Sequence, residues 1–181
     1  MTLAMTPEQQ RAFDEDGFVI LENFLTSAEL TRLSDAADEI VARIQKEQDL
    51  PPETHFQVRN ALAQHDAFLD LIDHPRMLPL VVDAIGWNIQ IRTTHLDYRP
   101  PYPEGLQPGE VGVGRGEDQK AGYRNLGWHP DLSSGHLFQA PSLDGRLPFF
   151  EIKVFYALSD LTESNSGNLW LSPGSSRLMK L

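Results

Sequence analysis

Residues 13–30, FDEDGFVILENFLTSAEL, contain signals for the end of one helix, an extended segment and the start of another helix. Gly17 is the residue type that most often ends a helix, because it adopts the left-handed conformation without strain. The segment GFVILENF, residues 17–24, is rich in β-branched and aromatic residues and predicts a strand. Thr26 with Glu29 forms a capping box, which predicts a second helix.

Both flanks of this stretch carry helix signals. Thr6 supplies a hydroxyl cap, Pro7 suits the first helical position and Gln9 can reach back to the cap, so a first helix is predicted up to Gly17. After Thr26, apolar residues recur at three- and four-residue steps, which is typical of an amphipathic helix. These residues are Leu30, Leu33, Ala37, Ile40, Val41 and Ile44.

The pattern then becomes shorter and changes type. The pair Pro51-Pro52 breaks the chain, and residues 67–72 and 77–85 are predicted to be short helical segments, separated by His74-Pro75 and closed by Gly86. Residues 1–86 are therefore expected to be mainly helical.

Strand patterns dominate from residue 87 onward. WNIQIRTTHLDY, residues 87–98, alternates apolar and polar side chains, and the prolines that follow it end a strand. FFEIKVFYAL, residues 149–158, is the most apolar strand candidate, and a turn at residues 165–167 leads into a short strand, NLWL, at 168–171. Residues 103–125 have no periodicity, which favours a functional lid or a disordered loop. We therefore expect one α+β domain over residues 1–181.

Composition narrows the function. The net charge of −11 opposes binding to nucleic acid or to an anionic membrane surface. The sequence contains no cysteine, so a metal ion would be held by imidazole and carboxylate groups. No apolar run approaches the length of a membrane span and no secretion signal is evident, which predicts a cytoplasmic protein.

His129-Pro130-Asp131, within NLGWHPDLSSGH at residues 125–136, is the candidate metal motif. In an extended segment, residues two apart point the same way, so both side chains can ligate one ion. Two histidines and one carboxylate form the facial triad of non-haem Fe(II) oxygenases. The alternative is a solvated turn in which Asp131 caps a backbone N–H. His95 and His136 are candidates for hydrogen bonding to metal ligands, whereas His55, His65 and His74 are expected to be surface or capping residues.

Four segments, in order, resemble the phytanoyl-CoA dioxygenase family of Fe(II)- and 2-oxoglutarate-dependent oxygenases. They are FDEDGFVILENFLTSAEL, WNIQIRTTHLDYRPP, WHPD and ALSDLTESNSGNLWLSPGSS, at residues 13–30, 87–101, 128–131 and 157–176. Their order along almost the whole chain is more specific than any one of them. The resemblance implies a mainly β, double-stranded β-helix (a cupin-like jelly roll) with flanking N-terminal helices, in which residues 87–181 form the first part of the core.

The resemblance also implies the chemistry. His129 and Asp131 would bind Fe(II), and Arg99 and Tyr156 would contact the cosubstrate 2-oxoglutarate. With dioxygen, such a centre oxidises a C–H bond of a small-molecule substrate, most simply by hydroxylation. Trp128 would lie beside the metal or in the core.

Two family features fall beyond the sequence. In the family, further strands after the PGSH motif supply a second iron histidine and an arginine for 2-oxoglutarate, whereas here Leu181 follows Ser176 by five residues. Three readings stay open: a fragment of a longer oxygenase, a jelly roll completed by another chain or by a homo-oligomer, or a catalytically inactive binding module.

Overall fold

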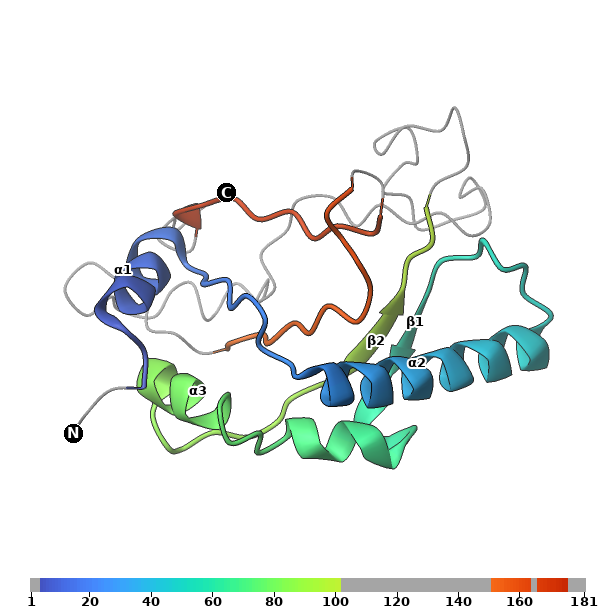
Figure 1. Ribbon diagram of the computed structural model, residues 1–181, viewed down its shortest axis with the longest axis horizontal. Coiled ribbons are helices and arrows are strands. Elements are labelled where there is room, and N and C mark those ends of the chain that lie inside the picture. Colours follow the sequence, from blue (N-terminus) through green and yellow to red (C-terminus); the bar gives the residue numbers. More distant parts are fainter. Residues whose placement is uncertain (1–3, 102–150, 164–165, 176–181) are drawn as a thin grey trace, which may run out of the picture.

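The computed structural model describes residues 4–101, 151–163 and 166–175. In chain order its elements are helices α1 and α2, strand β1, the short 3₁₀ helices η1 and η2, helix α3 and strand β2 (Figure 1). Helix α2 lies beside the small sheet, α1 and α3 lie together near the N-terminus, and residues 151–163 pass the N-terminal half of α2. The described part is therefore a mixed α+β structure.

Helix α1 spans Pro7–Asp16 and confirms the first predicted helix. The Thr6 hydroxyl accepts the backbone N–H of Gln9 at 3.2 Å, and the Gln9 side chain accepts the N–H of Thr6 at 2.9 Å. Gly17 has a left-handed conformation, with φ of 87°, and donates its N–H to Phe13 at 3.1 Å. Local side-chain bonds thus satisfy backbone groups that a helix end leaves without partners.

Helix α2 spans Ser27–Gln48 and confirms the second predicted helix. Thr26 and Glu29 form its capping box, and Asp49 ends it in the left-handed region, with φ of 52°. Its buried side chains follow the predicted stripe and are Leu33, Ala36, Ala37, Ile40 and Val41. Leu30 departs from the expected apolar face, because it is 39% exposed.

The sheet of the described residues has two antiparallel strands, β1 at Phe56–Arg59 and β2 at His95–Tyr98. Phe56 pairs with Tyr98 and Arg59 with His95. The rings of Phe56 and Tyr98 lie 5.1 Å apart, which is a favourable separation for an aromatic pair. Strand β1 was not predicted, and only the last four residues of the strand predicted at 87–98 form β2.

Short helices connect β1 to β2. Element η1 spans Ala61–Ala63, η2 spans Asp66–Leu71 and α3 spans Leu78–Ile85. The two helical segments predicted on either side of His74-Pro75 are therefore present, the first as a 3₁₀ helix. Gly86 closes α3 with a positive φ of 83°, as expected.

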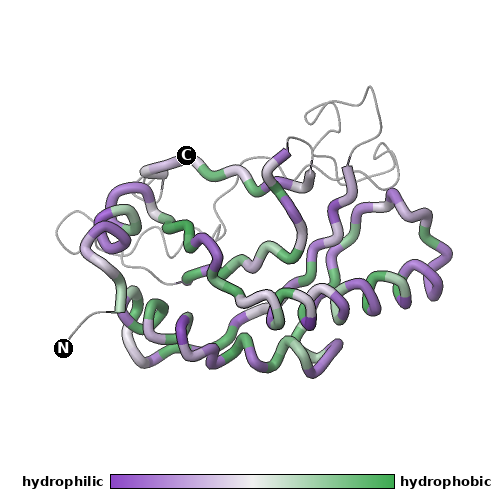
Figure 2. The backbone as a smooth tube through the Cα atoms, viewed as in Figure 1, coloured by the Kyte–Doolittle hydropathy of each residue, from purple (hydrophilic) through white to green (hydrophobic). Residues whose placement is uncertain are grey.

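The hydrophobic core lies between α2, the sheet and η2. Leu33 and Ile40 from α2 are the largest fully buried side chains, and they cluster with Val58 of β1 and with Ala67 and Phe68 of η2. Leu158, far along the chain, also packs against this cluster. In Figure 2, α2 alternates between hydrophobic and hydrophilic residues along its length, whereas α3 is hydrophobic along most of its length.

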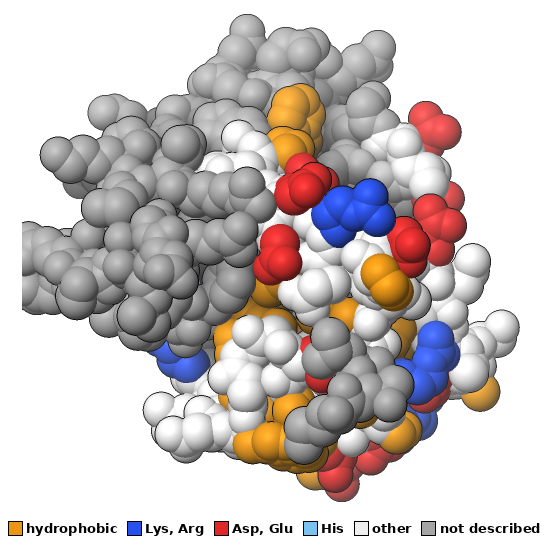
Figure 3. Space-filling model, turned by 90° about the vertical axis from the view of Figure 1, so that its left-hand side faces the viewer, with side chains coloured by type: hydrophobic (Ala, Val, Ile, Leu, Met, Phe, Trp, Pro, Cys, Tyr) orange, Lys and Arg blue, Asp and Glu red, His pale blue; other side chains and the backbone are white. Residues whose placement is uncertain are grey.

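Helix α3 is less covered than α2, since none of its residues is fully buried. Figure 3 views the end of the molecule that carries α1 and α3, and hydrophobic side chains gather low on this face, with acidic and basic side chains above them. The carboxylate of Asp83 accepts the backbone N–H of Met5 at 2.9 Å, which ties the start of the described chain to α3. Every helix in the described ranges is too short or too polar to cross a bilayer.

Three predicted strands are wrong within the described residues. Residues 17–24, 151–158 and 168–171 have no strand pairing. Their apolar side chains are only partly covered, because Tyr156 and Leu158 are half-buried while Phe155 and Trp170 are exposed. A strand, however, needs a neighbouring backbone for its N–H and C=O groups, and an apolar pattern does not specify one.

Hydrogen bonds help to attach the remaining described segments to the helices. The hydroxyl of Ser34 on α2 donates to the carbonyl of Leu158 at 3.0 Å. The N–H of Gly174 donates to the carbonyl of Asp16, at the end of α1, at 2.9 Å. The described residues thus hold a two-stranded sheet with helices and do not themselves form the jelly roll expected from the resemblance. The whole of the predicted lid, residues 103–125, lies outside the described residues.

Candidate functional site

The predicted iron ligands His129 and Asp131, together with Trp128 and His136, lie outside the described residues. Arg99 and Tyr156, the predicted contacts of 2-oxoglutarate, lie inside them. In the part of the chain that the structure describes, no three histidine or acidic side chains come together as a metal site. The described part of the candidate site is therefore the surroundings of Arg99 and Tyr156.

Arg99 directly follows β2 and is held against a glycine turn. Gly167 has a positive φ of 82°, and a Cβ atom built on it would lie 2.9 Å from both the Cβ and the carbonyl oxygen of Arg99. Such a separation is too short for any real side chain, so only glycine fits at this position. Gly167, predicted as a turn residue, thus lies directly against the residue that follows β2.

The Arg99 side chain is mostly covered, with 17% of it exposed. Its Nη2 atom lies 3.0 Å from Oδ1 of Asp97, and Gln57 Nε2 donates to the same carboxylate oxygen at 3.0 Å. A guanidinium carries five N–H donors, so this ion pair uses only part of its capacity. Arg99 is thus a positioned cation that suits a carboxylate ligand.

His55 lies beside Arg99. Its Nε2 atom is 2.6 Å from the carbonyl oxygen of Pro100, which can only accept, so Nε2 carries the proton. Burial lowers the pKa of His55 and the positive charge of Arg99 lowers it further, while the bond to Pro100 acts in the opposite direction. A neutral imidazole here avoids a second positive charge next to Arg99.

Tyr156 packs against the segment before α2. Its ring is 6.2 Å from the ring of Phe24. Its hydroxyl is buried and has no hydrogen-bond partner among the described residues. Burial, and secondarily the negative charge of Glu29, raise the pKa of Tyr156 to about 12. The hydroxyl therefore stays protonated and is a suitable donor for an acceptor group of a ligand.

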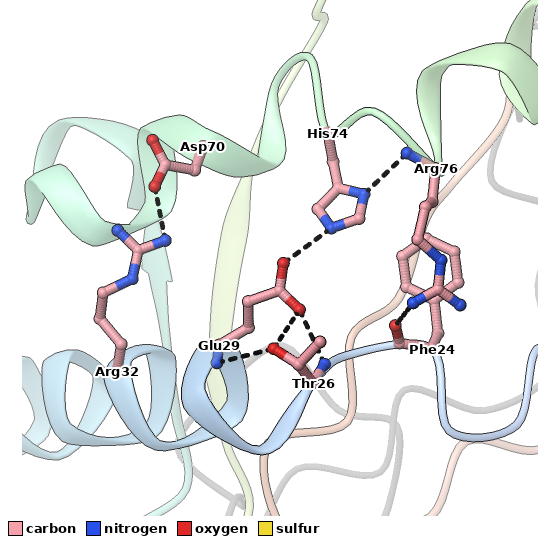
Figure 4. Close-up of polar contacts among 7 residues, drawn as sticks. All are labelled: Phe24, Thr26, Glu29, Arg32, Asp70, His74 and Arg76. Atoms are coloured by element: carbon pink, nitrogen blue, oxygen red, sulfur yellow. Dashed lines mark hydrogen bonds and ion pairs between the residues drawn. The ribbon is translucent and has the colours of Figure 1, made fainter.

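Glu29 is the anion that acts on Tyr156, and several donors hold it in place (Figure 4). Its Oε2 atom accepts both the backbone N–H and the hydroxyl of Thr26 at 2.7 Å, and its Oε1 atom lies 3.2 Å from Nε2 of His74. The bonds from Thr26, followed by the bond from His74, lower the pKa of Glu29 to about 2. Glu29 is therefore ionised at neutral pH.

His74 connects Glu29 to the segment between η2 and α3. It is 5% exposed, and its Nδ1 atom accepts the backbone N–H of Arg76 at 3.2 Å. Because Nδ1 is an acceptor, the proton lies on Nε2, which donates to Glu29. His74 was expected to be a surface or capping residue; it caps the N–H of Arg76 but is buried. His65 does cap a helix, since its Nδ1 accepts the N–H of Ala67 at 3.0 Å.

Phe24 completes this cluster. Its ring lies 5.0 Å from that of His74, and the Arg76 guanidinium stands 4.5 Å from the Phe24 ring centre. Arg76 Nη1 also donates to the carbonyl of Phe24 at 2.6 Å. Sequence reasoning identified Glu29 only as a capping residue and missed Phe24 and Arg76. The bond between Glu29 and His74 joins residues 45 positions apart, so it leaves no local signal in the sequence.

The structure thus places Arg99 and Tyr156 in different surroundings. Arg99 contacts Asp97 and the turn at Gly167. Tyr156 contacts Phe24, and the negative charge of Glu29 helps to raise its pKa. Each provides a feature suited to a carboxylate-bearing ligand: a positioned cation in one case and a buried donor in the other.

Comparison with known proteins identifies the family. A family model described as "Phytanoyl-CoA dioxygenase (PhyH)" matches residues 13–180. The chain belongs to this family. It is 26% identical over 178 residues to an ectoine dioxygenase from Nocardia farcinica, and the match covers 94% of this chain and 51% of that protein. The chain thus spans about half the length of that relative. No solved structure matches it.

Proposed function

We propose that the protein is a non-haem Fe(II)- and 2-oxoglutarate-dependent dioxygenase that oxidises a C–H bond of a small molecule. The observation that carries this proposal is the family match over residues 13–180, which includes the complete His129-Pro130-Asp131 motif. The relative named as a dioxygenase supports the reaction class, but its identity of 26% does not carry its substrate to this chain.

His129 and Asp131 would supply an imidazole and a carboxylate, which are ligand types that ferrous iron accepts in this class of enzyme. Arg99 and Tyr156 would hold the cosubstrate, Arg99 through its charge and Tyr156 through its protonated hydroxyl. When bound, Fe(II) with 2-oxoglutarate would supply the activation of dioxygen. A jelly-roll core for the whole protein, a lid over residues 103–125 and a cytoplasmic setting belong to the same proposal.

Two features of the described residues fit 2-oxoglutarate. The buried hydroxyl of Tyr156 has no partner among these residues, and a ligand oxygen would satisfy it. Arg99 is fixed by Asp97 and by the glycine turn, so little side-chain freedom would be lost on binding a carboxylate. These residues would orient the cosubstrate and exclude water around its carboxylate.

Succinate release tests the proposal in the full-length protein. We expect release that requires Fe(II) and 2-oxoglutarate and that is abolished by His129→Ala. The matched control is His65→Asn, since His65 caps η2 and stands outside the proposed site. If His129→Ala behaves as wild type, a noncatalytic binding module becomes the better account.

A further inference from the structure

The cluster of Glu29, His74, Arg76 and Phe24 has no role in the function proposed above, although its polar groups make several hydrogen bonds. Glu29 receives three hydrogen bonds, and His74 is buried with both ring nitrogens engaged. A capping box needs only Thr26 and Glu29. The additional bond to a buried histidine from another element therefore calls for a separate explanation.

The contacts of the cluster lead to Tyr156. His74 and Tyr156 both lie against the Phe24 ring, at centroid distances of 5.0 and 6.2 Å. Arg76 fixes Phe24 through its carbonyl and through its ring face. The backbone beside Tyr156 is attached independently, since Leu158 accepts the Ser34 hydroxyl on α2. Phe24 thus packs against both His74 and Tyr156 and links the two.

We propose that Glu29 and His74 are positioning residues that act through Phe24 to hold the Tyr156 hydroxyl as a hydrogen-bond donor for a carboxylate-bearing cosubstrate. This inference rests on the proposed function of Tyr156 in 2-oxoglutarate binding. Glu29 keeps His74 in the Nε2–H form, and His74 in turn packs on Phe24. The hydroxyl of Tyr156 then stays buried, with its proton available to a ligand.

The informative substitution is Glu29→Gln. It removes the charge but retains the capping box, because glutamine serves this motif as glutamate does. The same chain uses Gln9 with Thr6 in this way at the start of α1. Asp70→Asn is the matched control, since Asp70 pairs with Arg32 at 2.5 Å and also joins α2 to η2 (Figure 4). Unlike His74, both of these side chains are exposed to solvent.

A double-mutant cycle with Tyr156→Phe separates positioning from general destabilisation. The measured quantity is the Kd of 2-oxoglutarate for the full-length protein with Mn(II) in place of Fe(II). We expect Tyr156→Phe to weaken binding about tenfold and Glu29→Gln roughly three- to tenfold in the wild-type background. In the Tyr156→Phe background, Glu29→Gln should have no further effect, and Asp70→Asn should have none in either.

Equal effects of Glu29→Gln in both backgrounds, or no effect in either, would overturn the inference.

The ¹³C resonance of labelled Tyr156, assigned with Tyr156→Phe, provides a readout without any ligand. We expect Glu29→Gln to move this resonance and Asp70→Asn to leave it unchanged. If it moves while the wild-type protein does not bind 2-oxoglutarate, the proposed function fails but the positioning of Tyr156 stands. If it does not move, the positioning fails.

Discussion

Gly167→Ala tests the contact that attaches residues 166–175 to the end of β2. The new Cβ would lie 2.9 Å from the Cβ and the carbonyl oxygen of Arg99. A left-handed residue with a side chain costs about 1–2 kcal/mol, and overpacking typically adds about 1–3 kcal/mol. The expected loss in the free energy of unfolding is therefore about 2–5 kcal/mol.

Gly174→Ala is the control for backbone strain. Gly174 also has a positive φ, of 74°, but its added Cβ would meet only the Glu15 carbonyl oxygen, at an ordinary 3.7 Å. We expect it to cost about 1–2 kcal/mol, from backbone conformation alone. Urea unfolding curves of both variants measure the difference. Equal losses for the two substitutions would refute the close approach of Gly167 to Arg99.

Two further predictions concern α2. Leu33→Ala should lower the free energy of unfolding by about 2–5 kcal/mol, because Leu33 is 1% exposed. Leu30→Ala on the same helix should cost much less, because Leu30 is 39% exposed. Thermal unfolding measures both variants, and similar losses would contradict the core described above. Glu29 has a pKa lowered from 4.5 to about 2, so its ionised form stabilises the fold above pH 4.5 and this stabilisation is lost as the pH falls toward 2. The stability difference between wild type and Glu29→Gln should therefore shrink across that range, and a constant difference would contradict the bonds to Glu29.

The helices could be predicted because their signals are local. The capping boxes Thr6–Gln9 and Thr26–Glu29 each close within three residues, and both form as predicted. The apolar stripe of α2 needs only its own 3.6-residue period to define the buried face. These features depend little on the rest of the chain.

The strands could not be predicted in the same way, because pairing depends on distant residues. Phe56 pairs with Tyr98, and nothing in the sequence around either residue identifies its partner. Residues 149–158 were predicted to be a strand because they are apolar, yet residues 151–158 form no ladder. Apolar composition therefore predicted neither the pairing of these backbones nor, at Phe155 and Trp170, the burial of the side chain.

The candidate site shows the same division. Gly167 was predicted as a turn residue, but its contact with Arg99 emerged only from the fold. The Glu29–His74 bond joins residues 45 positions apart and had no sequence signal. His129 and Asp131 stay predictions that rest on the order of the family's motifs.

Metal binding by His129 and Asp131 tests the central claim most directly. Calorimetric titration of the full-length protein with Mn(II), in the presence of 2-oxoglutarate, should give one site in wild type and in His65→Asn. His129→Ala and Asp131→Ala should each lose that site. Binding that is unchanged in both alanine variants would contradict the assignment of these two residues as metal ligands.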